Sequence, residues 1–235
     1  MGSTRLHELE EQFAALGESI EDSPVKDALS VLHAIVHEMR GGDATGAVTM
    51  APAGPTIEDV ANLYRQAPAM EGTAESGGLS IGTEAPDFEL PDANGTIVRL
   101  SDFRGRPVVL AFYPLDWSPG CSRQLDLYQQ ELDEFARRGV EIIGISVDSI
   151  YSHGAWAAVR GITFPLLADF HPKGEVAKRY GVWRESDGFS ERALFVVDGD
   201  GVIRYAHVSP YIEHVPDIYD LYAALDEVGQ PAVAA

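Results

Sequence analysis

The sequence predicts an α/β fold with a mixed central sheet flanked by helices. Residues 107–113 read PVVLAFY, a short apolar run rich in β-branched and aromatic side chains that suits a buried strand. After position 121, apolar residues recur at steps of three and four, as they do along one face of a helix. Residues 198–201 read DGDG, which is a strong turn signal for a hairpin. Strands that alternate with helices and end in a hairpin are typical of this fold class.

Residues 1–78 are predicted to form a helical extension with flexible linkers, and residues 79–235 to form a separate domain. In the extension, two series of apolar residues at steps of three and four predict two amphipathic helices joined by a short turn, the second opened by Ser23 and Pro24. The two series are Leu6, Leu9, Phe13, Leu16 and Ile20, then Val25, Ala28, Leu32, Ile35 and Met39.

Two loose segments and a third, short helix complete the predicted extension. Residues 41–55 are rich in Gly, Ala, Thr and Pro, residues 67–78 form the second loose segment, and Thr56 opens a short helix between them. So short a helical hairpin can hardly bury its own apolar stripes, so we expect it to support self-association or partner binding, or else to pack on the other domain. His33 and His37 accompany no carboxylate motif, so we expect solvated helix residues and no metal site.

In the second domain, the strand at 107–113 ends at Pro114 because proline cannot donate to a ladder. A helical stripe follows at Leu125, Tyr128, Leu132 and Phe135. The full predicted order is a strand near Val98, strand 107–113, a helix over 121–138, strand 141–147 (EIIGISV), a helix near Ala155, a strand near Phe164, a helix near Ala177, a hairpin over 192–208 and a final helix.

Cys121 is the only cysteine in the sequence, and it stands where the strand gives way to a helix. Pro119 and Gly120 break the extended chain, which places Cys121 in the first helical turn. Unpaired amide donors and the helix dipole stabilise a thiolate there, and such environments can lower a thiol pKa from about 8.5 to roughly 3.5–7.5. The alternative is a buried small hydrophobic residue, which is what most unpaired cysteines are.

Pro114, Ser118 and Cys121 are spaced as PxxxSxxC, which resembles the active-site signature of the peroxiredoxins, the alkyl hydroperoxide reductase and thiol-specific antioxidant family. Other segments resemble that family in the same order: IGTEAPDFELPDANGTIVRLSDFRGRPVVLAFYPLDW from Ile81, FPLLADFHPKGEVAKRYGV from Phe164 and RALFVVDGDGVIRYA from Arg192. The resemblance runs from about Leu79 to about Val228 and implies a thioredoxin-like fold. Because the chain has a single cysteine, it most resembles the one-cysteine peroxiredoxins, especially those similar to alkyl hydroperoxide reductase E.

The resemblance implies four site residues and no metal or organic cofactor. Cys121 is implied as the peroxidatic nucleophile and Ser118 as its hydroxyl partner, although Ser118 also suits an ordinary helix cap. Pro114 is implied as a shield of the sulfur from water, or it merely ends the strand. Arg192 is implied as the guanidinium whose permanent charge favours the thiolate and polarises a bound peroxide.

Two neighbouring residues bear on this site. Gln124 stands where many members of the family carry a glutamate, so a charged contact at the subunit edge or the active-site rim is expected to be missing. Asp116 would oppose thiolate formation if its carboxylate pointed inward, but on a polar turn we expect it to face solvent.

The implied function is a thiol-dependent peroxidase for hydrogen peroxide or organic hydroperoxides. Attack by the Cys121 thiolate gives a sulfenic acid, which an external thiol must recycle because one cysteine cannot form an intramolecular disulfide. Expected partners are thioredoxin, a mycoredoxin-like protein or a small thiol, and a second copy of the chain in a homodimer or higher homo-oligomer. Two alternatives stay open: a thioredoxin-fold binding or scaffold module that works through the N-terminal helical arm, and a peroxide sensor that signals through the same sulfenic acid.

Composition argues against other classes of partner. The 37 acidic and 17 basic residues give a formal net charge of -20, which would repel nucleic acid and anionic membrane surfaces. No stretch is long and apolar enough to span a membrane, and the opening MGSTRLHELEEQF has no basic region followed by an apolar run. A reducing cytoplasm is therefore the expected compartment.

Overall fold

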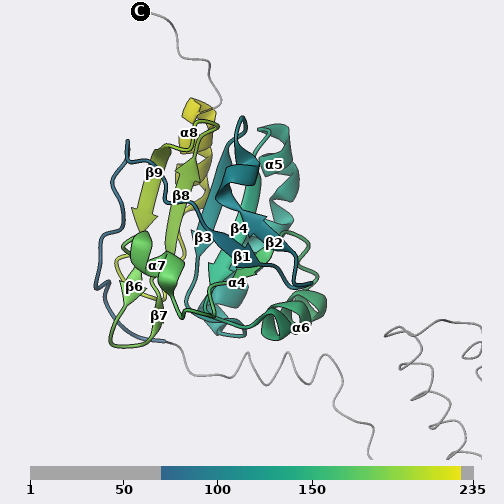
Figure 1. The fold of residues 1–235 in the computed structure, drawn as a ribbon, viewed down its shortest axis with the longest axis vertical. Coiled ribbons are helices and arrows are strands. Elements are labelled where there is room, and N and C mark those ends of the chain that lie inside the picture. Colours follow the sequence, from purple (N-terminus) through teal and green to yellow (C-terminus); the bar gives the residue numbers. More distant parts are fainter. Residues whose placement is uncertain (1–69, 229–235) are drawn as a thin grey trace, which may run out of the picture. The chain divides into compact units, whose positions relative to one another are not determined.

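The computed structural model of the chain describes residues 70–228. The helices expected in residues 1–66, and with them most of the predicted extension, lie outside the described residues. Figure 1 shows the described part as a central sheet with helices and small hairpins around it. Within residues 70–228, no helix has the length and apolar character needed to cross a membrane.

The described elements follow the predicted succession of strands and helices. The strands are Glu89–Pro91 (β1), Ile97–Arg99 (β2), Val108–Phe112 (β3), Glu141–Ser146 (β4), Leu166–Ala168 (β5), Trp183–Arg184 (β6), Phe189–Ser190 (β7), Ala193–Val197 (β8) and Ile203–Val208 (β9). The helices are Pro119–Gln130 (α4), Leu132–Arg137 (α5), Ile150–Arg160 (α6), Glu175–Arg179 (α7) and Ile218–Val228 (α8), with a 3-10 turn (η1) at Leu100–Phe103.

Five of these strands form the central sheet, in the order β5-β4-β3-β8-β9. The pairs β3–β4 and β4–β5 are parallel, whereas β8 is antiparallel to both β3 and β9. The sheet is therefore mixed, which confirms the predicted α/β class. The predicted hairpin turn is also confirmed, because the Gly201 N–H donates to the Asp198 carbonyl at 2.9 Å between β8 and β9.

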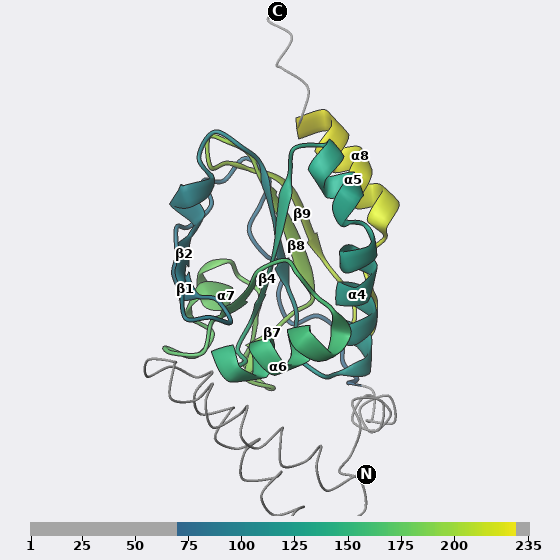
Figure 2. The same cartoon turned by 90° about the vertical axis from the view of Figure 1, so that its right-hand side faces the viewer.

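Apolar side chains cover both faces of the central sheet. Alternate residues of β3 point to opposite faces, so that Val108 and Leu110 join one buried cluster while Val109 and Ala111 join another. In Figure 2, helices α4, α5 and α8 lie over one face, and β1, β2 and α7 lie over the other. The sheet is thus the middle layer between two apolar layers.

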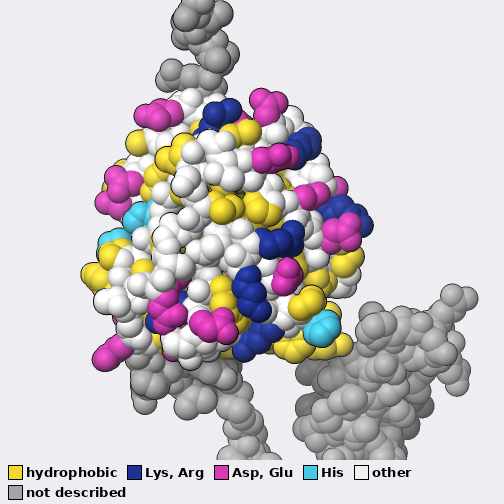
Figure 3. Space-filling model, turned by 60° about the vertical axis from the view of Figure 1, so that its left-hand side comes forward, with side chains coloured by type: hydrophobic (Ala, Val, Ile, Leu, Met, Phe, Trp, Pro, Cys, Tyr) yellow, Lys and Arg dark blue, Asp and Glu magenta, His cyan; other side chains and the backbone are white. Residues whose placement is uncertain are grey.

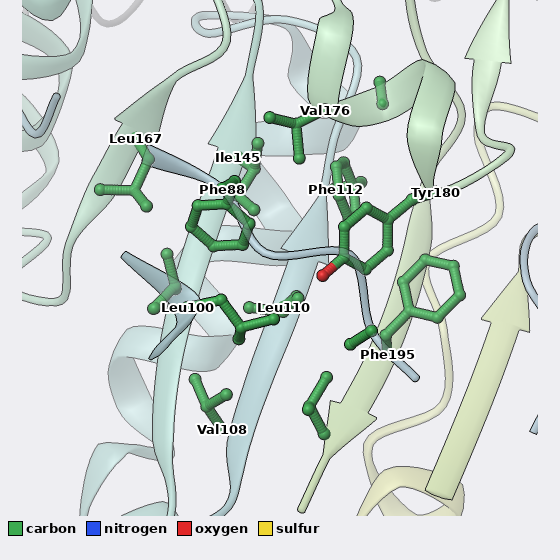
Figure 4. Close-up of a cluster of buried hydrophobic side chains, with 14 of the residues drawn as sticks. Phe88, Leu100, Val108, Leu110, Phe112, Ile145, Leu167, Val176, Tyr180 and Phe195 are labelled. Carbon is green, nitrogen blue, oxygen red and sulfur yellow. The ribbon is translucent and has the colours of Figure 1, made fainter. Parts of the chain in front are cut away.

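The layer on the side of β1, β2 and α7 is rich in aromatic rings. Figure 4 shows Phe88, Phe112, Tyr180 and Phe195 converging there with aliphatic side chains from the sheet. The rings of Phe112 and Phe195 meet edge to face, with centroids 5.8 Å apart. This packing fixes β3 and β8 against each other from one side.

Several elements differ from the prediction, which lacked strand β1 and the turn η1. The helix predicted over 121–138 begins earlier, at Pro119, and is divided at Glu131, whose ψ is 9°. Proline suits the first helical turn, because its missing N–H would have no helical partner there. The strand predicted near Phe164 begins at Leu166. The hairpin of β6 and β7 is not predicted, because strands of two residues show no readable alternation.

The ends of β3 and β8 determine where the site lies. In this antiparallel pair, Phe112 at the end of β3 is opposite Ala193 at the start of β8. The chain therefore leaves β3 towards α4 beside the point where it enters β8. Arg192, which immediately precedes β8, is brought in this way to the beginning of α4.

Candidate active site

Cys121 lies in the first turn of α4, with its side chain turned inward. It is a free thiol, and its exposed fraction is 0%. Ser118 is the N-cap of the helix, and its Oγ accepts a hydrogen bond from the Cys121 N–H at 3.3 Å. The sequence offered two alternatives for Cys121, a thiol in a first helical turn and a buried small hydrophobic residue. In the structure both descriptions apply, because Cys121 lies in the first turn of α4 and belongs to a buried apolar cluster.

Arg192 is the charged group that reaches the sulfur. Its exposed fraction is 0%, and its Nη2 lies 3.5 Å from Cys121 Sγ. Its Nε donates to the Ile212 carbonyl at 2.9 Å, and its Nη1 donates to Gln124 Oε1. These contacts occupy the guanidinium on three sides, so its positive charge is fixed beside the sulfur.

Gln124 lies inside the protein, beside the guanidinium of Arg192. Its exposed fraction is 0%; besides accepting from Arg192, it donates from Nε2 to Tyr128 Oη at 3.0 Å. The neutral amide supplies an acceptor to the guanidinium without adding a negative charge next to Cys121. Burial raises the pKa of Tyr128 above its usual value, which keeps that hydroxyl protonated.

Pro114 is buried in the loop that joins β3 to α4. The carbonyl of Tyr113, in the peptide bond before Pro114, accepts a hydrogen bond from Ser190 Oγ at 3.0 Å. Ser190 is the last residue of β7, so the hairpin of β6 and β7, which was not predicted from the sequence, fixes this loop through that hydrogen bond. The structure therefore brings Arg192 and Ser118 into contact with Cys121 and places Pro114 in the same loop.

Asp116 faces the interior, and the expectation that it faces solvent is wrong. Its side chain has an exposed fraction of 0% and accepts hydrogen bonds from Tyr113 Oη at 2.9 Å and Ser152 Oγ at 2.7 Å. The carboxylate also lies 2.9 Å from His153 Nδ1, and the Asp116 N–H donates to Asp148 Oδ2 at 2.9 Å. Ser152 and His153 of helix α6 thus bind the Asp116 carboxylate in the interior. The residue spacing within the turn could not indicate these partners, because they lie on another element.

This buried network changes the proton affinity of its members. Burial raises the pKa of Asp148 above its ordinary value of 3.8, and the neighbouring Asp116 carboxylate raises it further. Burial also raises the pKa of Tyr113, so its hydroxyl remains a donor to Asp116. Ser146 Oγ donates to Asp148 Oδ2 at 2.7 Å, which ties the network to β4.

Residues 81–206 match the AhpC/TSA family. That range is more than half of the 235 residues, and it contains Pro114, Ser118, Cys121 and Arg192. This chain belongs to the AhpC/TSA family.

Several curated relatives are named alkyl hydroperoxide reductase E or peroxiredoxin. Alkyl hydroperoxide reductase E of Mycobacterium tuberculosis is 42% identical over 131 residues, which is 55% of this chain and 86% of the relative. Peroxiredoxin-1 of Gallus gallus is 39% identical over 140 residues, which is 55% of this chain and 69% of that protein. The predicted membership of the peroxiredoxins is therefore confirmed, and the single cysteine fits the one-cysteine type.

Solved structures give the same result for the fold. The peroxidoxin BcpB of Mycobacterium tuberculosis is similar with a TM-score of 0.58 and 32% identity, over 64% of this chain and 98% of that one. A reduced 2-Cys peroxiredoxin of Plasmodium vivax is similar with a TM-score of 0.58 and 28% identity, over 63% of this chain and 81% of that one. The thioredoxin-like fold implied by the sequence resemblance is confirmed.

Three residues that support the site in this AhpC/TSA protein were not predicted as site residues from the sequence. Tyr128 could have been, because it stands four residues after Gln124 on the same helix. Ile212 contributes a backbone carbonyl, which no side-chain motif can indicate. Ser190 acts from a hairpin too short to predict. In the described part of the chain, no group of three or more His, Cys, Asp or Glu residues is placed to hold a metal ion.

Proposed function

We propose that this AhpC/TSA protein is a thiol-dependent peroxidase that reduces hydrogen peroxide or organic hydroperoxides at Cys121. The observation that carries the proposal is the 3.5 Å distance between Arg192 Nη2 and Cys121 Sγ. It places a permanent cation beside the only thiol of the sequence. A binding or scaffold module is not favoured, because such a module has no physical need for a buried guanidinium fixed beside a thiol.

The first half-reaction consumes the peroxide. A sulfur lone pair of the Cys121 thiolate forms an S–O bond to one peroxide oxygen while the O–O bond breaks. The other oxygen leaves with the bond electrons, takes a proton from water and departs as water or an alcohol. Arg192 and the positive end of the α4 helix dipole stabilise the negative charge that develops on it.

Ser118 and Pro114 have supporting roles in this proposal. The Ser118 hydroxyl already accepts from the Cys121 N–H, so its own proton is available to the sulfur or to a bound peroxide. Pro114 is buried and has no N–H, so it can cover the sulfur without offering a competing donor.

The second half-reaction needs a thiol from outside the chain. The sulfenic acid on Cys121 condenses with that thiol to a mixed disulfide and water, and a second thiol then releases the reduced enzyme. Thioredoxin, a mycoredoxin-like protein and a small thiol are the candidate reductants, and a homodimer or higher homo-oligomer is the proposed assembly. If the sulfenic acid passes its oxidation to a dedicated partner, the same chemistry serves as a peroxide sensor.

The test is a rapid oxidation experiment on reduced protein. One equivalent of hydrogen peroxide or an organic hydroperoxide is added for milliseconds to seconds with a sulfenic-acid trap, and the intact mass is measured. Cys121→Ser is the blank, Arg192→Ala tests the cation, and Arg137→Ala is the matched control because that side chain is 66% exposed.

The proposal expects trap-sensitive oxidation of the parent and of Arg137→Ala at similar rates, and no oxidation of Cys121→Ser. Arg192→Ala should be oxidised at least about tenfold more slowly, which corresponds to about 1.4 kcal/mol of transition-state stabilisation. A parent that reacts no faster than a free thiol would reject the peroxidase. Equal rates for Arg192→Ala and the parent would remove Arg192 from the site.

A further inference from the structure

A short segment before the family match is tied to the surroundings of Arg192. We call residues Gly72–Glu75 the strap. It precedes residue 81, where the family match begins, and it belongs to the dark blue chain that runs along the outer margin of Figure 1 beside β6 and β9. Its hydrogen bonds reach two places, the loop after β9 and the buried residues before β8.

The first place is Ile212, in the loop after β9. The Ile212 N–H donates to the Gly72 carbonyl at 2.9 Å, and the Ala74 N–H donates to the Pro210 carbonyl at 3.0 Å. The Ile212 carbonyl accepts the Nε–H of Arg192 at 2.9 Å. Ile212 has an exposed fraction of 2%, so water offers little replacement for these partners. One buried residue is therefore bonded to the strap through its amide and to the guanidinium through its carbonyl.

The second place is Glu191, the residue before Arg192. Glu191 has an exposed fraction of 1%, and its Oε1 accepts the Glu75 N–H at 2.6 Å. Its two oxygens also accept from Arg184 Nη1 at 3.2 and 3.1 Å, and this nitrogen donates to the Thr73 carbonyl at 2.8 Å. Buried charges need such partners, because leaving one unpaired is strongly destabilising. The strap therefore completes the buried ion pair that adjoins Arg192.

The Glu75 side chain anchors the strap from outside. Its carboxylate accepts from the Glu185 N–H at 3.1 Å and from the Ser186 hydroxyl, and it lies 3.5 Å from Arg184 Nη2. Figure 3 brings this margin forward and shows acidic and basic side chains interspersed there. The strap is thus attached through its backbone on both sides and through a charged side chain.

We propose that the strap is a positioning element for Arg192, so that oxidation of Cys121 by peroxide depends on a segment outside the family match. This inference rests on the proposed function. The strap fixes Ile212 at the Nε side of the guanidinium and Glu191 at the preceding backbone. Arg192 Nη2 already lies 3.5 Å from the sulfur, so a further displacement weakens the contact. A misplacement of about 1 Å can cost on the order of 100-fold in rate.

Two glycines provide a matched test. Gly72 has a φ of 144°, which side chains rarely adopt, and an added Cβ would lie 2.8 Å from Arg184 Nη2. An added Cβ at Gly77, just beyond the strap, would have nothing within 4 Å. Gly72→Ala should therefore displace the strap, whereas Gly77→Ala should not. The measurement is the second-order rate constant of Cys121 oxidation by hydrogen peroxide in the full chain, followed by stopped flow.

The same Gly72→Ala change is also made in an Arg192→Ala background. We expect Gly72→Ala to slow oxidation by about tenfold or more when Arg192 is present, and by less than about twofold when it is absent. A merely structural loss would slow both backgrounds by the same factor, because the effects of independent sites multiply in rate. The slowing caused by Gly72→Ala with Arg192 present, divided by the slowing with Arg192 absent, therefore measures how much of the effect of the strap depends on Arg192.

Equal rates for Gly72→Ala and Gly77→Ala would overturn the inference, and so would equal slowing in both backgrounds. If Gly72→Ala does not fold, Glu75→Ala removes the outer anchor while keeping the backbone, and the same two comparisons and outcomes apply to it. A parent no faster than a free thiol would remove the proposed function and, with it, this inference. A fast parent whose strap variants are equally fast would remove the inference alone.

Discussion

At the scale of single residues, the site depends on a short series of buried polar groups. Arg192 donates to Gln124, and Gln124 donates to Tyr128 Oη at 3.0 Å. All three side chains have an exposed fraction of 0%, so water cannot replace a lost partner. The orientation of the guanidinium towards Cys121 Sγ is therefore a property of the whole series.

Gln124→Leu tests this series. The change keeps the side chain's bulk but removes the acceptor of Arg192 Nη1 and the donor to Tyr128 Oη. Leaving the buried Nη1 of Arg192 without its acceptor should lower the free energy of unfolding by about 1–3 kcal/mol and slow Cys121 oxidation. Urea unfolding and stopped-flow oxidation measure the two effects. Gln130→Leu, at an exposed position of α4, is the control, and equal behaviour of the two variants would contradict the prediction.

Asp148→Asn tests the buried network around Asp116. Since the pKa of Asp148 is raised in the folded chain, the stability contributed by its protonated form is present below about pH 3.9 and is lost as the pH rises through the folded pKa. An asparagine cannot ionise and escapes this loss. From about pH 4 to about pH 7, the variant should therefore gain unfolding free energy relative to the parent.

Urea unfolding at a series of pH values measures this difference. Asp200→Asn is the control, because that residue is exposed and its change should shift the curve little at any pH. A difference between Asp148→Asn and the parent that stays constant with pH would show that the raised pKa contributes nothing to stability.

At the scale of elements, the first turn of α4 limits what can reach the sulfur. Cys121 has an exposed fraction of 0%, so a macromolecular thiol can meet its sulfenic acid only after this turn moves. The turn is held by the Ser118 cap and by Arg192. Both contacts therefore have two effects, because they support the reaction with peroxide and delay the reaction with a large reductant.

Two serine caps allow these effects to be separated. Ser118 caps α4 and Ser149 caps α6, where its Oγ accepts from the Ser152 N–H at 3.3 Å. Ser118→Ala and Ser149→Ala should each lower the unfolding free energy by about 1 kcal/mol. Only Ser118→Ala should also change the rate of Cys121 oxidation, measured by stopped flow. A similar change of rate in Ser149→Ala would mean that the cap acts through stability alone.

The elements differ in how well the sequence predicts them. The stripe at Leu125, Tyr128 and Phe135 correctly predicted a helix, because each of these side chains is at most 1% exposed in the structure. The division at Glu131 was not predicted, because the apolar spacing continues through it. Pairing between β3 and β8 is a long-range contact that no local pattern encodes, so Arg192 entered the predicted site only through the family resemblance.

Orientation was the least predictable property of the site. Gln124 was considered only for the charge that it lacks, and Asp116 was expected to face solvent, yet both side chains are buried. In each case the deciding partner belongs to another element: Arg192 before β8 for the first, and His153 on α6 for the second. Sequence spacing locates a side chain on its own helix or turn, but it does not reveal what will pack against it.

At the scale of the whole molecule, the described unit is larger than the family match at residues 81–206. The strap precedes that range, and helix α8 follows it. Leu221 and Leu225 of α8 have exposed fractions of 0% and 2%, and they belong to the same apolar cluster as Cys121. Residues on both sides of the match therefore complete the core beside the site. The boundary predicted at residues 78 and 79 stays a prediction, as does the role of the helical extension.

Leu221→Ala tests the contribution of α8. Removing this buried side chain should lower the unfolding free energy by about 2–5 kcal/mol, because a cavity is left in the core. Tyr219→Ala on the same helix should cost much less, since Tyr219 is 75% exposed. Chemical unfolding measures both. Equal stability of the two variants would mean that α8 does not pack on the sheet in solution.

Because Cys121 is the single cysteine of the sequence, the thiol content of a sample reports the fraction of its active sites that are reduced. After denaturation, each mole of thiol counted in a purified sample is one mole of reduced active site, and each missing mole is one oxidised site. No other cysteine in the sequence has to be blocked or subtracted. A thiol titration at intervals therefore reads the working fraction of a preparation directly.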